Sequence, residues 1–234
     1  SFICACELGN EDHVKWFIEF YTIKGSLDHM IDEEGLYSTG NSKWTPLSVA
    51  SFYGKLNVVK ILLGHGVNVD KPRIRDGKTA LMFACSEGNI EIVKVLIKHG
   101  AKINEPCSQD GKTALMLACS QGNIEIVKHL LDHGGKVGLK DRDNKSAFVY
   151  ALIENKEDIV KFLLENVTYE VALNAKVNFE ESCREITTNE KGAMKLLLNW
   201  LCKKLIAKYE EEFPRRTPIV CACQKGRFED VKLL

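Results

Sequence analysis

The sequence of 234 residues lacks an excess of charge of either sign, because its Lys and Arg total 32 and its Asp and Glu also total 32. It also lacks any face-wide run of basic residues, so electrostatic binding of nucleic acid has little support. No apolar run approaches the roughly 18 residues of a membrane-spanning helix. No segment has the pattern of a secretory signal peptide. We therefore expect neither a nucleic-acid partner nor insertion into a membrane.

The sequence does contain one unit that recurs four times. The copies run from Thr45 to Gly66, Thr79 to Gly100, Thr113 to Gly134 and Ser146 to Asn166. Successive copies begin 34, 34 and 33 residues apart. A fixed period of this length is typical of repeat architectures, in which each unit packs on its neighbours. The repetition therefore predicts a stack of similar modules.

Each copy holds two apolar segments separated by Gly or Asn, which predicts two helices. The hydroxyl that opens each copy suits an N-cap, because its oxygen can accept from unpaired amides of the first turn. In the second segment Ile92, Val93 and Leu96 lie on one face at helical spacing, and Gly100 ends that helix. Neither helix is long enough to be stable alone in water, so each pair must bury its apolar face against the next pair.

Several of these features occur together: Thr45-Pro-Leu, Thr217-Pro-Ile, Gly-Asn at 88–89 and 122–123, and the His-Gly endings. In combination they resemble the ankyrin repeat. The resemblance implies an all-α fold with short β-hairpin connectors, an ankyrin-repeat solenoid of stacked helix-turn-helix units. One departure is consistent, because the family's usual His after Thr-Pro-Leu is replaced in every copy, for example by Ser48 and Met82. The Thr–His hydrogen bond of the family is then absent.

We expect residues 1–234 to form a single ankyrin-repeat array. The first repeat, about 1–44, is partial and carries a long connector, and regular copies follow at 45–78, 79–112 and 113–145. The copy at 146–187 contains an insertion, the copy at 188–216 is degenerate, and the copy at 217–234 is truncated. Because both ends fall inside a repeat, we expect a monomeric array within a longer chain.

Two registers are possible for the degenerate copy. One aligns Leu201–Ile206 with Ile92–Ile97, and the other aligns Ala193–Leu198 with the same segment. We favour the first register because it leaves helix spacing intact through Lys208.

The nine cysteines follow the repeat rather than a metal-binding pattern. Cys6, Cys85, Cys119 and Cys223 occupy one equivalent position beside the inner alanine, where a small buried side chain fits between helices. This placement favours packing over metal or redox chemistry. An odd number of mostly helix-embedded thiols also favours a reducing compartment. We expect the protein in the cytoplasm, with the nucleus as the alternative.

Two segments, Gly77-Lys-Thr79 and Gly111-Lys-Thr113, end like a phosphate-binding loop. That motif needs a Gly five residues earlier, where Pro72 and Pro106 stand, and a hairpin tip is the better interpretation. His65, His99 and His133 form a ladder at the repeat period. Stacked helices lie about 10 Å apart, which is too far for shared ligation of a metal at about 2 Å.

No Ser, Cys, His and carboxylate set outside the repeat framework suggests a nucleophile with its base. We therefore expect no catalytic residue, no metal and no cofactor.

The positions that vary between copies describe a surface. By the resemblance, partners are held by the hairpin tips and by the exposed end of each first helix. The first-helix positions are Glu7, Leu8, Phe52, Tyr53, Ser86, Glu87, Ser120, Gln121, Ile153, Glu154, Gln224 and Lys225. The tip positions are Trp44, Arg75, Asp76, Lys78, Gln109, Asp110, Lys112, Asp143, Lys145, Arg215 and Arg216.

Three aromatic residues of one repeat, Trp44, Phe52 and Tyr53, belong to residue types that supply interface anchors. The alternative is that the longer loop before Trp44 folds over them and makes them part of the core. Our leading hypothesis is a non-catalytic protein-interaction module, an adaptor or scaffold that binds another protein. The alternative is a regulatory or targeting segment of a larger enzyme, channel or ubiquitin-ligase-type protein.

Asn104 lies at the family's hairpin-proximal Asn, and the resemblance implies a modification site, because equivalent positions are hydroxylated in other ankyrin repeats. We expect the Asn104 peptide of the protein made in a eukaryotic host to carry one added oxygen. Mass spectrometry of intact peptides measures this. An Asn104 peptide with no added oxygen would remove the prediction.

Overall fold

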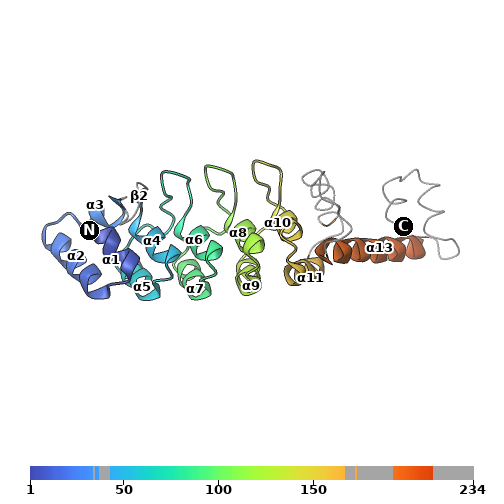
Figure 1. The fold of residues 1–234 in the computed structure, drawn as a ribbon, viewed down its shortest axis with the longest axis horizontal. Helices are drawn as coiled ribbons and strands as arrows, with labels where there is room; N and C mark the ends of the chain where they lie inside the picture. The colour runs from blue at the N-terminus through green and yellow to red at the C-terminus, as the bar shows by residue number, and fades with distance from the viewer. Residues whose placement is uncertain (34, 37–42, 167–171, 173–191, 213–234) are drawn as a thin grey trace. The chain divides into compact units, whose positions relative to one another are not determined.

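The computed structural model describes residues 1–33, 35–36, 43–166, 172 and 192–212 (Figure 1). It divides into two compact units, Ser1–Asp143 and Asn144–Leu234, and each is described here by itself. The described residues of both units lie mainly in helices. This confirms the all-α fold that the repeat pattern predicts.

The first unit is a succession of helix pairs. They are α1 (Phe2–Leu8) with α2 (Glu11–Ile23), α4 (Pro46–Phe52) with α5 (Leu56–Gly64), α6 (Ala80–Ser86) with α7 (Ile90–Lys98), and α8 (Ala114–Gln121) with α9 (Ile124–Asp132). A short helix, α3 (Leu27–Ile31), follows α2. Figure 1 shows α4, α6 and α8 in one row and α5, α7 and α9 in a second row. Each pair lies beside the next, as expected of a solenoid.

The connectors between successive pairs are hairpins that project from the row of first helices (Figure 1). The first contains two short antiparallel strands, β1 (Gly35–Leu36) and β2 (Lys43–Trp44), paired Gly35 with Trp44 and Leu36 with Lys43. The next two are closed by equivalent backbone hydrogen bonds of 2.9 Å, from Arg73 N to Lys78 O and from Cys107 N to Lys112 O. The predicted β-hairpin is therefore present in the first connector, whereas residues 67–78 and 101–112 form hairpin loops without strands.

The N-caps lie where the sequence predicts them. Thr45 Oγ1 accepts from Ser48 N at 3.1 Å, and the hydroxyls of Thr79, Thr113 and Ser146 each accept from the backbone N three residues later at 3.4 Å. Pro46 occupies the first turn of α4, where its missing N–H costs nothing. These bonds fix the start of each first helix at the end of its hairpin.

The Gly-Asn pair between the two helices of a repeat has two separate roles. Gly88 has a φ of 77°, a conformation that glycine adopts without strain. The following Asn89 reaches back to the preceding repeat, where its Nδ2 donates to Ser51 O at 3.0 Å. Asn123 does the same to Cys85 O at 3.3 Å. The Gly forms the turn within one repeat, and the following Asn makes a hydrogen bond to the preceding repeat.

The core of the first unit lies between the two rows of helices. Ala84 and Ala118 are fully buried, and the neighbouring Cys85 and Cys119 are fully buried free thiols. Burial raises the pKa of both thiols above the usual range of cysteine, so they stay protonated and pack as small apolar groups. Cys6 is buried in the same manner, whereas Cys223 lies outside the described residues.

The second unit contains α10 (Ala147–Ile153), α11 (Glu157–Asn166) and α13 (Gly192–Glu212). Asn155 stands where other copies have Gly, and it adopts a φ of 52°, which Asn tolerates better than most residues. Its Oδ1 accepts from Ala193 N at 3.1 Å, which places the start of α13 against the turn between α10 and α11.

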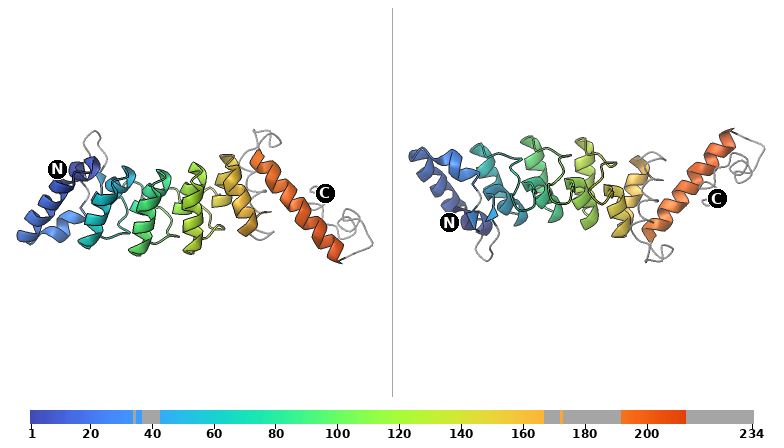
Figure 2. Two further views of the ribbon diagram at one scale, coloured as in Figure 1. Left: turned by 90° about the horizontal axis from the view of Figure 1, so that it is seen from below. Right: turned by 90° about the horizontal axis from the view of Figure 1, so that it is seen from above.

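The sequence predicts a helix-turn-helix copy at 188–216, but residues 192–212 form one uninterrupted helix (Figure 2). In the favoured register Leu197 and Leu198 align with Gly88 and Asn89. Because neither leucine favours a turn, the helix continues through this position. The truncated copy at 217–234 and most of the insertion after Asn166 lie outside the described residues, so the count of seven repeats stays a prediction. Among the helices of the described residues, none is both long and apolar enough to span a membrane.

Stability is expected to be graded along the chain, because each repeat is held mainly by its neighbours. Amides between Thr79 and Gly134, which belong to the most regular copies, should exchange hydrogen most slowly. Amides between Val167 and Arg216 should exchange early, through local opening. Hydrogen exchange followed by mass spectrometry measures both segments in one experiment, and equal protection throughout would contradict the prediction.

Candidate interaction surface

The predicted first-helix residues lie at the ends of these helices. Ser86 and Gln121 are the last residues of α6 and α8, and Glu87 directly follows α6. Glu87 and Gln121 are exposed, whereas Ser86 and Ser120 are half-buried. Ser86 Oγ donates to Phe83 O at 3.0 Å, so its hydroxyl is partly used within the helix. The structure thus brings these polar groups of adjacent repeats to one surface.

The remaining first-helix positions are less uniform. Leu8 is 72% exposed, and Glu7 is half-buried. In the second unit Ile153 is half-buried and Glu154 is exposed. Gln224 and Lys225 lie outside the described residues, as do Arg215 and Arg216 of the tip set.

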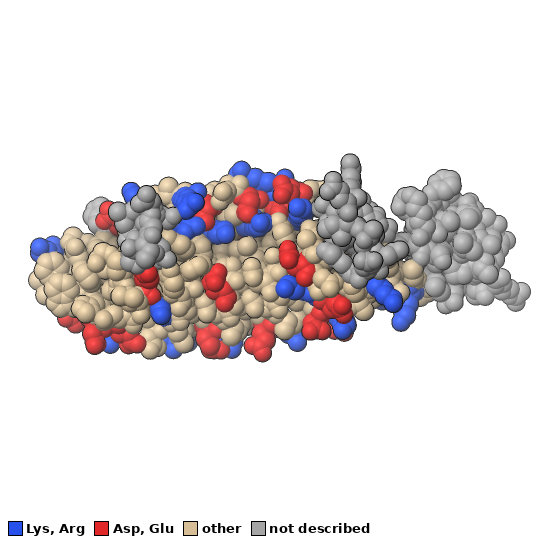
Figure 3. All heavy atoms as spheres, in the orientation of Figure 1, with Lys and Arg blue, Asp and Glu red and all other residues tan. Residues whose placement is uncertain are grey.

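The hairpins of the first unit form a connected edge, which we call the hairpin edge and define as residues 68–78, 102–112 and 136–143. Gln109 N donates to Asp76 O at 3.2 Å, and Arg142 N donates to Asp110 O at 3.0 Å. Arg142 also donates from its guanidinium to Ser108 O at 2.6 Å. Charged side chains gather along this edge (Figure 3). Because each tip is bonded to the next, the edge is a rigid platform rather than three separate loops.

Most tip residues are accessible on this edge. Arg75, Gln109 and Asp143 are exposed. Lys78, Asp110 and Lys112 are half-buried, as is Lys145 in the second unit. The exceptions are Asp76 and Trp44, both of which are buried.

Of the two alternatives for Trp44, an interface anchor or part of the core, its burial favours the core. Its side chain is 8% exposed, and its ring centroid lies 5.3 Å from that of Phe52 and 4.7 Å from that of Phe83. The Arg73 guanidinium covers the ring at 4.1 Å from its centroid. Trp44 is therefore part of the core between two repeats, because the following hairpin supplies a cation above it. Phe52 and Tyr53 are half-buried, with centroids 5.1 Å apart, and their role in binding stays a prediction.

Asp76 is committed to a buried ion pair with Arg73. Arg73 Nε donates to Asp76 Oδ1 at 3.0 Å, and a second guanidinium nitrogen donates to Oδ2. Burial alone would raise the pKa of Asp76, but the hydrogen bonds from Arg73 and Lys78 N and the charge of Arg73 hold the pKa below its usual value. Asp76 is therefore ionised at neutral pH and supports the hairpin from within.

Sequence analysis missed Arg73, although a signal was present. Pro72 and Pro106 are each followed by a residue whose side chain donates to the Asp of the same tip, Arg73 to Asp76 and Cys107 to Asp110. The shared spacing from Pro to Asp could have indicated an internal contact. The equivalence of the two contacts was not recognised because Arg73 and Cys107 are chemically different and share only the ability to donate a hydrogen bond.

Asn104 connects two repeats through its side-chain amide. Its Nδ2 donates to Gly134 O at 2.9 Å, and its Oδ1 accepts from Lys136 N at 2.9 Å. Asp70 has the equivalent position one repeat earlier and accepts from Lys102 N at 2.9 Å. Asn104 is half-buried. Hydroxylation at this residue stays a prediction.

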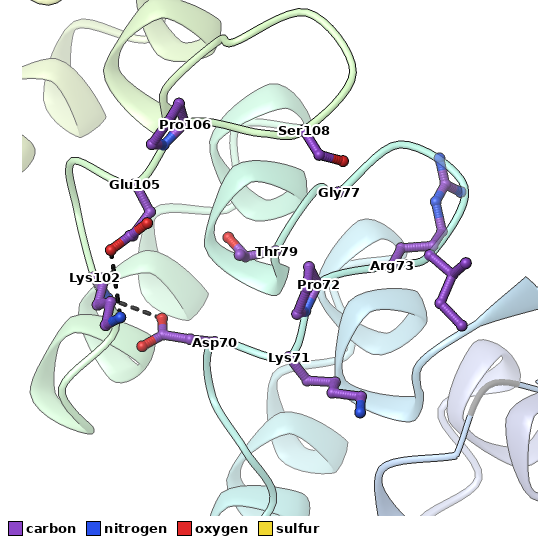
Figure 4. Close-up of a pocket in the computed structure, with 11 residues that line it drawn as sticks. Asp70, Lys71, Pro72, Arg73, Gly77, Thr79, Lys102, Glu105, Pro106 and Ser108 are labelled. Atoms are coloured by element: carbon purple, nitrogen blue, oxygen red, sulfur yellow. Dashed lines mark hydrogen bonds and ion pairs between the residues drawn. The ribbon is translucent and has the colours of Figure 1, made fainter.

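A cavity of about 420 Å³ lies between two successive hairpins of the edge (Figure 4). Its lining residues are Asp70, Lys71, Pro72, Arg73, Ile74, Gly77, Thr79, Lys102, Glu105, Pro106 and Ser108. Lys102 is held there by its own neighbours, with its backbone N on Asp70 and its Nζ 3.3 Å from Glu105 Oε1. Within the described part of the chain, no group of three or more His, Cys, Asp or Glu side chains is placed to hold a metal ion.

Comparison with known families accounts for this architecture. A family model described as ankyrin repeats (3 copies) matches residues 2–107 and 102–176. The matched ranges cover well over half of the chain, so the chain belongs to the ankyrin-repeat family, and the resemblance found in its sequence is confirmed. A search of curated proteins found no match. Ankyrin repeats are in general modules for binding other proteins.

The two tip aspartates offer a matched test of the buried ion pair. Each accepts from the backbone N two residues later, but Asp76 also holds a buried Arg. Asp76→Ala should lower the free energy of unfolding by about 2–3 kcal/mol, because it leaves the Arg73 charge buried without its partner. Asp110→Ala should cost under about 1 kcal/mol, since its ion pair is partly exposed. Urea unfolding measures both values.

The same variants predict a dependence on pH. Because folding lowers the pKa of Asp76, its contribution is fully present above the unfolded value of about 3.9 and is lost as pH falls further. The gap between wild type and Asp76→Ala should therefore shrink below about pH 4. Equal losses for the two alanine variants at neutral pH would show that the ion pair contributes nothing beyond the shared turn.

Proposed function

We propose that this chain is a non-catalytic protein-interaction module, an adaptor or scaffold that holds a protein partner across the hairpin edge and the exposed ends of the first helices. Membership of the ankyrin-repeat family supports the general role. The proposal includes the expectation that residues 1–234 belong to one array.

The observation that carries the proposal is the contrast between constant interior and variable surface in adjacent repeats. Ala84-Cys85 and Ala118-Cys119 are identical and buried in both copies. Directly beyond them the exposed residue is Glu87 in one copy and Gln121 in the next. A repeat whose buried framework is constant while the exposed ends of its first helices differ has the arrangement expected of a binding surface, because only the surface can distinguish one ligand from another.

The rigidity of the hairpin edge also supports binding. Successive tips are joined by the bonds from Gln109 N to Asp76 O and from Arg142 N to Asp110 O. A surface that is ordered before binding loses less conformational entropy when a partner docks. The hairpin edge can therefore use more of its contact energy for affinity.

Two bulky double variants should test the module. Gln109→Trp with Gln121→Trp places large side chains on the proposed surface, at one tip and one first-helix end. The control, Lys98→Trp with Glu125→Trp, places them at exposed positions of the second helices α7 and α9. Proteins captured from lysate by wild type and by the control should be depleted about tenfold or more with the first variant, because a few central contacts carry most binding energy.

Quantitative mass spectrometry of the captured proteins measures this depletion, and matching melting temperatures check that both variants fold. If both variants capture the same proteins as wild type, the partner uses another face. If wild type captures no protein above a bead control, the role of interaction module itself is contradicted.

A further inference from the structure

The hairpin edge carries a surplus of positive charge that the chain as a whole does not have. Its three segments contain nine Lys and Arg residues and six Asp and Glu residues, in a chain whose totals are equal. Charge of one sign gathered beside a cavity raises the local concentration of ligands of the opposite sign. The edge is therefore suited to an acidic ligand, provided that its basic groups are accessible.

The acidic groups of the edge are already engaged within the chain. Asp76 is paired with Arg73, Glu105 with Lys102 Nζ, and Asp110 with Lys112 Nζ at 3.1 Å. Asp70 accepts from Lys102 N, and Asp141 accepts from Asp143 N at 3.0 Å. Three of the six carboxylates of the edge therefore have a basic side chain as a partner within the chain.

Several basic groups of the edge are in the opposite situation. Lys71, Lys136 and Lys140 are exposed. Among the described residues, none offers a side-chain partner to these three ammonium groups. Lys71 also lines the cavity between the two hairpins. These three ammonium groups therefore add accessible positive charge to the edge.

The cavity adds an apolar component to this charge. Pro72 and Pro106, from two successive hairpins, line the same space (Figure 4). Ile74, which also lines it, is 80% exposed, one of the most exposed large apolar side chains of the described residues. Proline rings are rigid, so this apolar site is formed before any ligand arrives.

We propose that this cavity binds an apolar side chain of an extended acidic segment of a partner protein, with Lys71 beside it and Lys136 and Lys140 farther along the edge meeting the segment's carboxylates. The inference rests on the proposed function and specifies the chemistry of the partner. A nucleic acid fits less well, because its continuous phosphate charge would pass over Asp70 and Glu105 in the lining, whereas a peptide can space its carboxylates around them.

A phage-displayed library of random dodecapeptides is the probe, and the most enriched peptide is then synthesised with a fluorescent label. Enriched sequences should contain Asp or Glu on both sides of an apolar residue. Fluorescence anisotropy should show that Lys71→Glu weakens the Kd of the labelled peptide about tenfold, equivalent to about 1.4 kcal/mol, and that Ile74→Ser weakens it as well. The affinity should also fall as salt is raised, because the charges are exposed.

Lys98→Glu is the matched control, since Lys98 is also exposed but lies at the end of α7, on a second helix. It should leave the Kd unchanged. Circular dichroism checks that all three variants are folded. Enrichment of neutral or basic peptides, an equal effect of Lys98→Glu and Lys71→Glu, or tighter binding of a labelled single-stranded DNA than of the peptide would each overturn the inference.

The two experiments distinguish failure of the acidic-segment inference from failure of the proposed function. If lysate proteins are lost with Gln109→Trp and Gln121→Trp but no acidic peptide is selected, the interaction module stands and the acidic partner is wrong. If an acidic peptide is selected and responds to Lys71→Glu but wild type captures no lysate protein, the cavity binds acidic peptides and the role of adaptor is wrong.

Discussion

The structure depends on packing between neighbouring repeats. The seven residues of α6 and the nine of α7 are too few for either helix to persist alone in water. Their stability comes from burying apolar side chains such as Leu81 and Leu96, with the small Ala84 and Cys85 filling the remaining space. Asn89 and Asn123 then bond backward to carbonyls of the preceding first helix, so polar groups at each interface are also paired. A hairpin is held in place only because the helices below it are stacked in this way.

The repeated parts of this fold could be predicted from sequence because their causes are local. A hydroxyl at the start of a helix, as at Thr79, and a Gly in the turn, as at Gly88, act within a few residues of themselves. Because these cap and turn residues recur at the same spacing, they can be told apart from chance occurrences of the same residue types. The features that the sequence did not predict come from contacts that occur in only one repeat. Trp44 is covered by Arg73 of the next hairpin, and no other described repeat contains that pair, so periodicity gives no warning of it.

Equivalent positions in a repeat protein can be buried in one copy and exposed in another. The candidate surface therefore contains fewer residues than the repeat pattern predicts. Asp76 and Asp110 occupy the same place in successive tips, yet Asp76 is buried against Arg73 while Asp110 is partly exposed beside Lys112. A family pattern would assign both to partner binding. The structure assigns Asp76 to the interior, because its ion pair with Arg73 packs against aromatic rings and is shielded from solvent. Whether a tip residue is available to bind a partner depends on its neighbour in the same hairpin. This neighbour differs from copy to copy.

The differences between successive hairpins also determine the direction in which an extended segment can bind across the cavity. The hairpin at 68–78 lines the cavity with Lys71 and Ile74, whereas its successor lines the cavity with Glu105 and Ser108. Two identical hairpins would offer a ligand the same contacts in either orientation. Unlike hairpins favour one orientation, since a reversed segment would present different side chains to Lys71 and to Glu105. A repeated framework thus becomes a directional binding surface through changes at a few exposed tip positions.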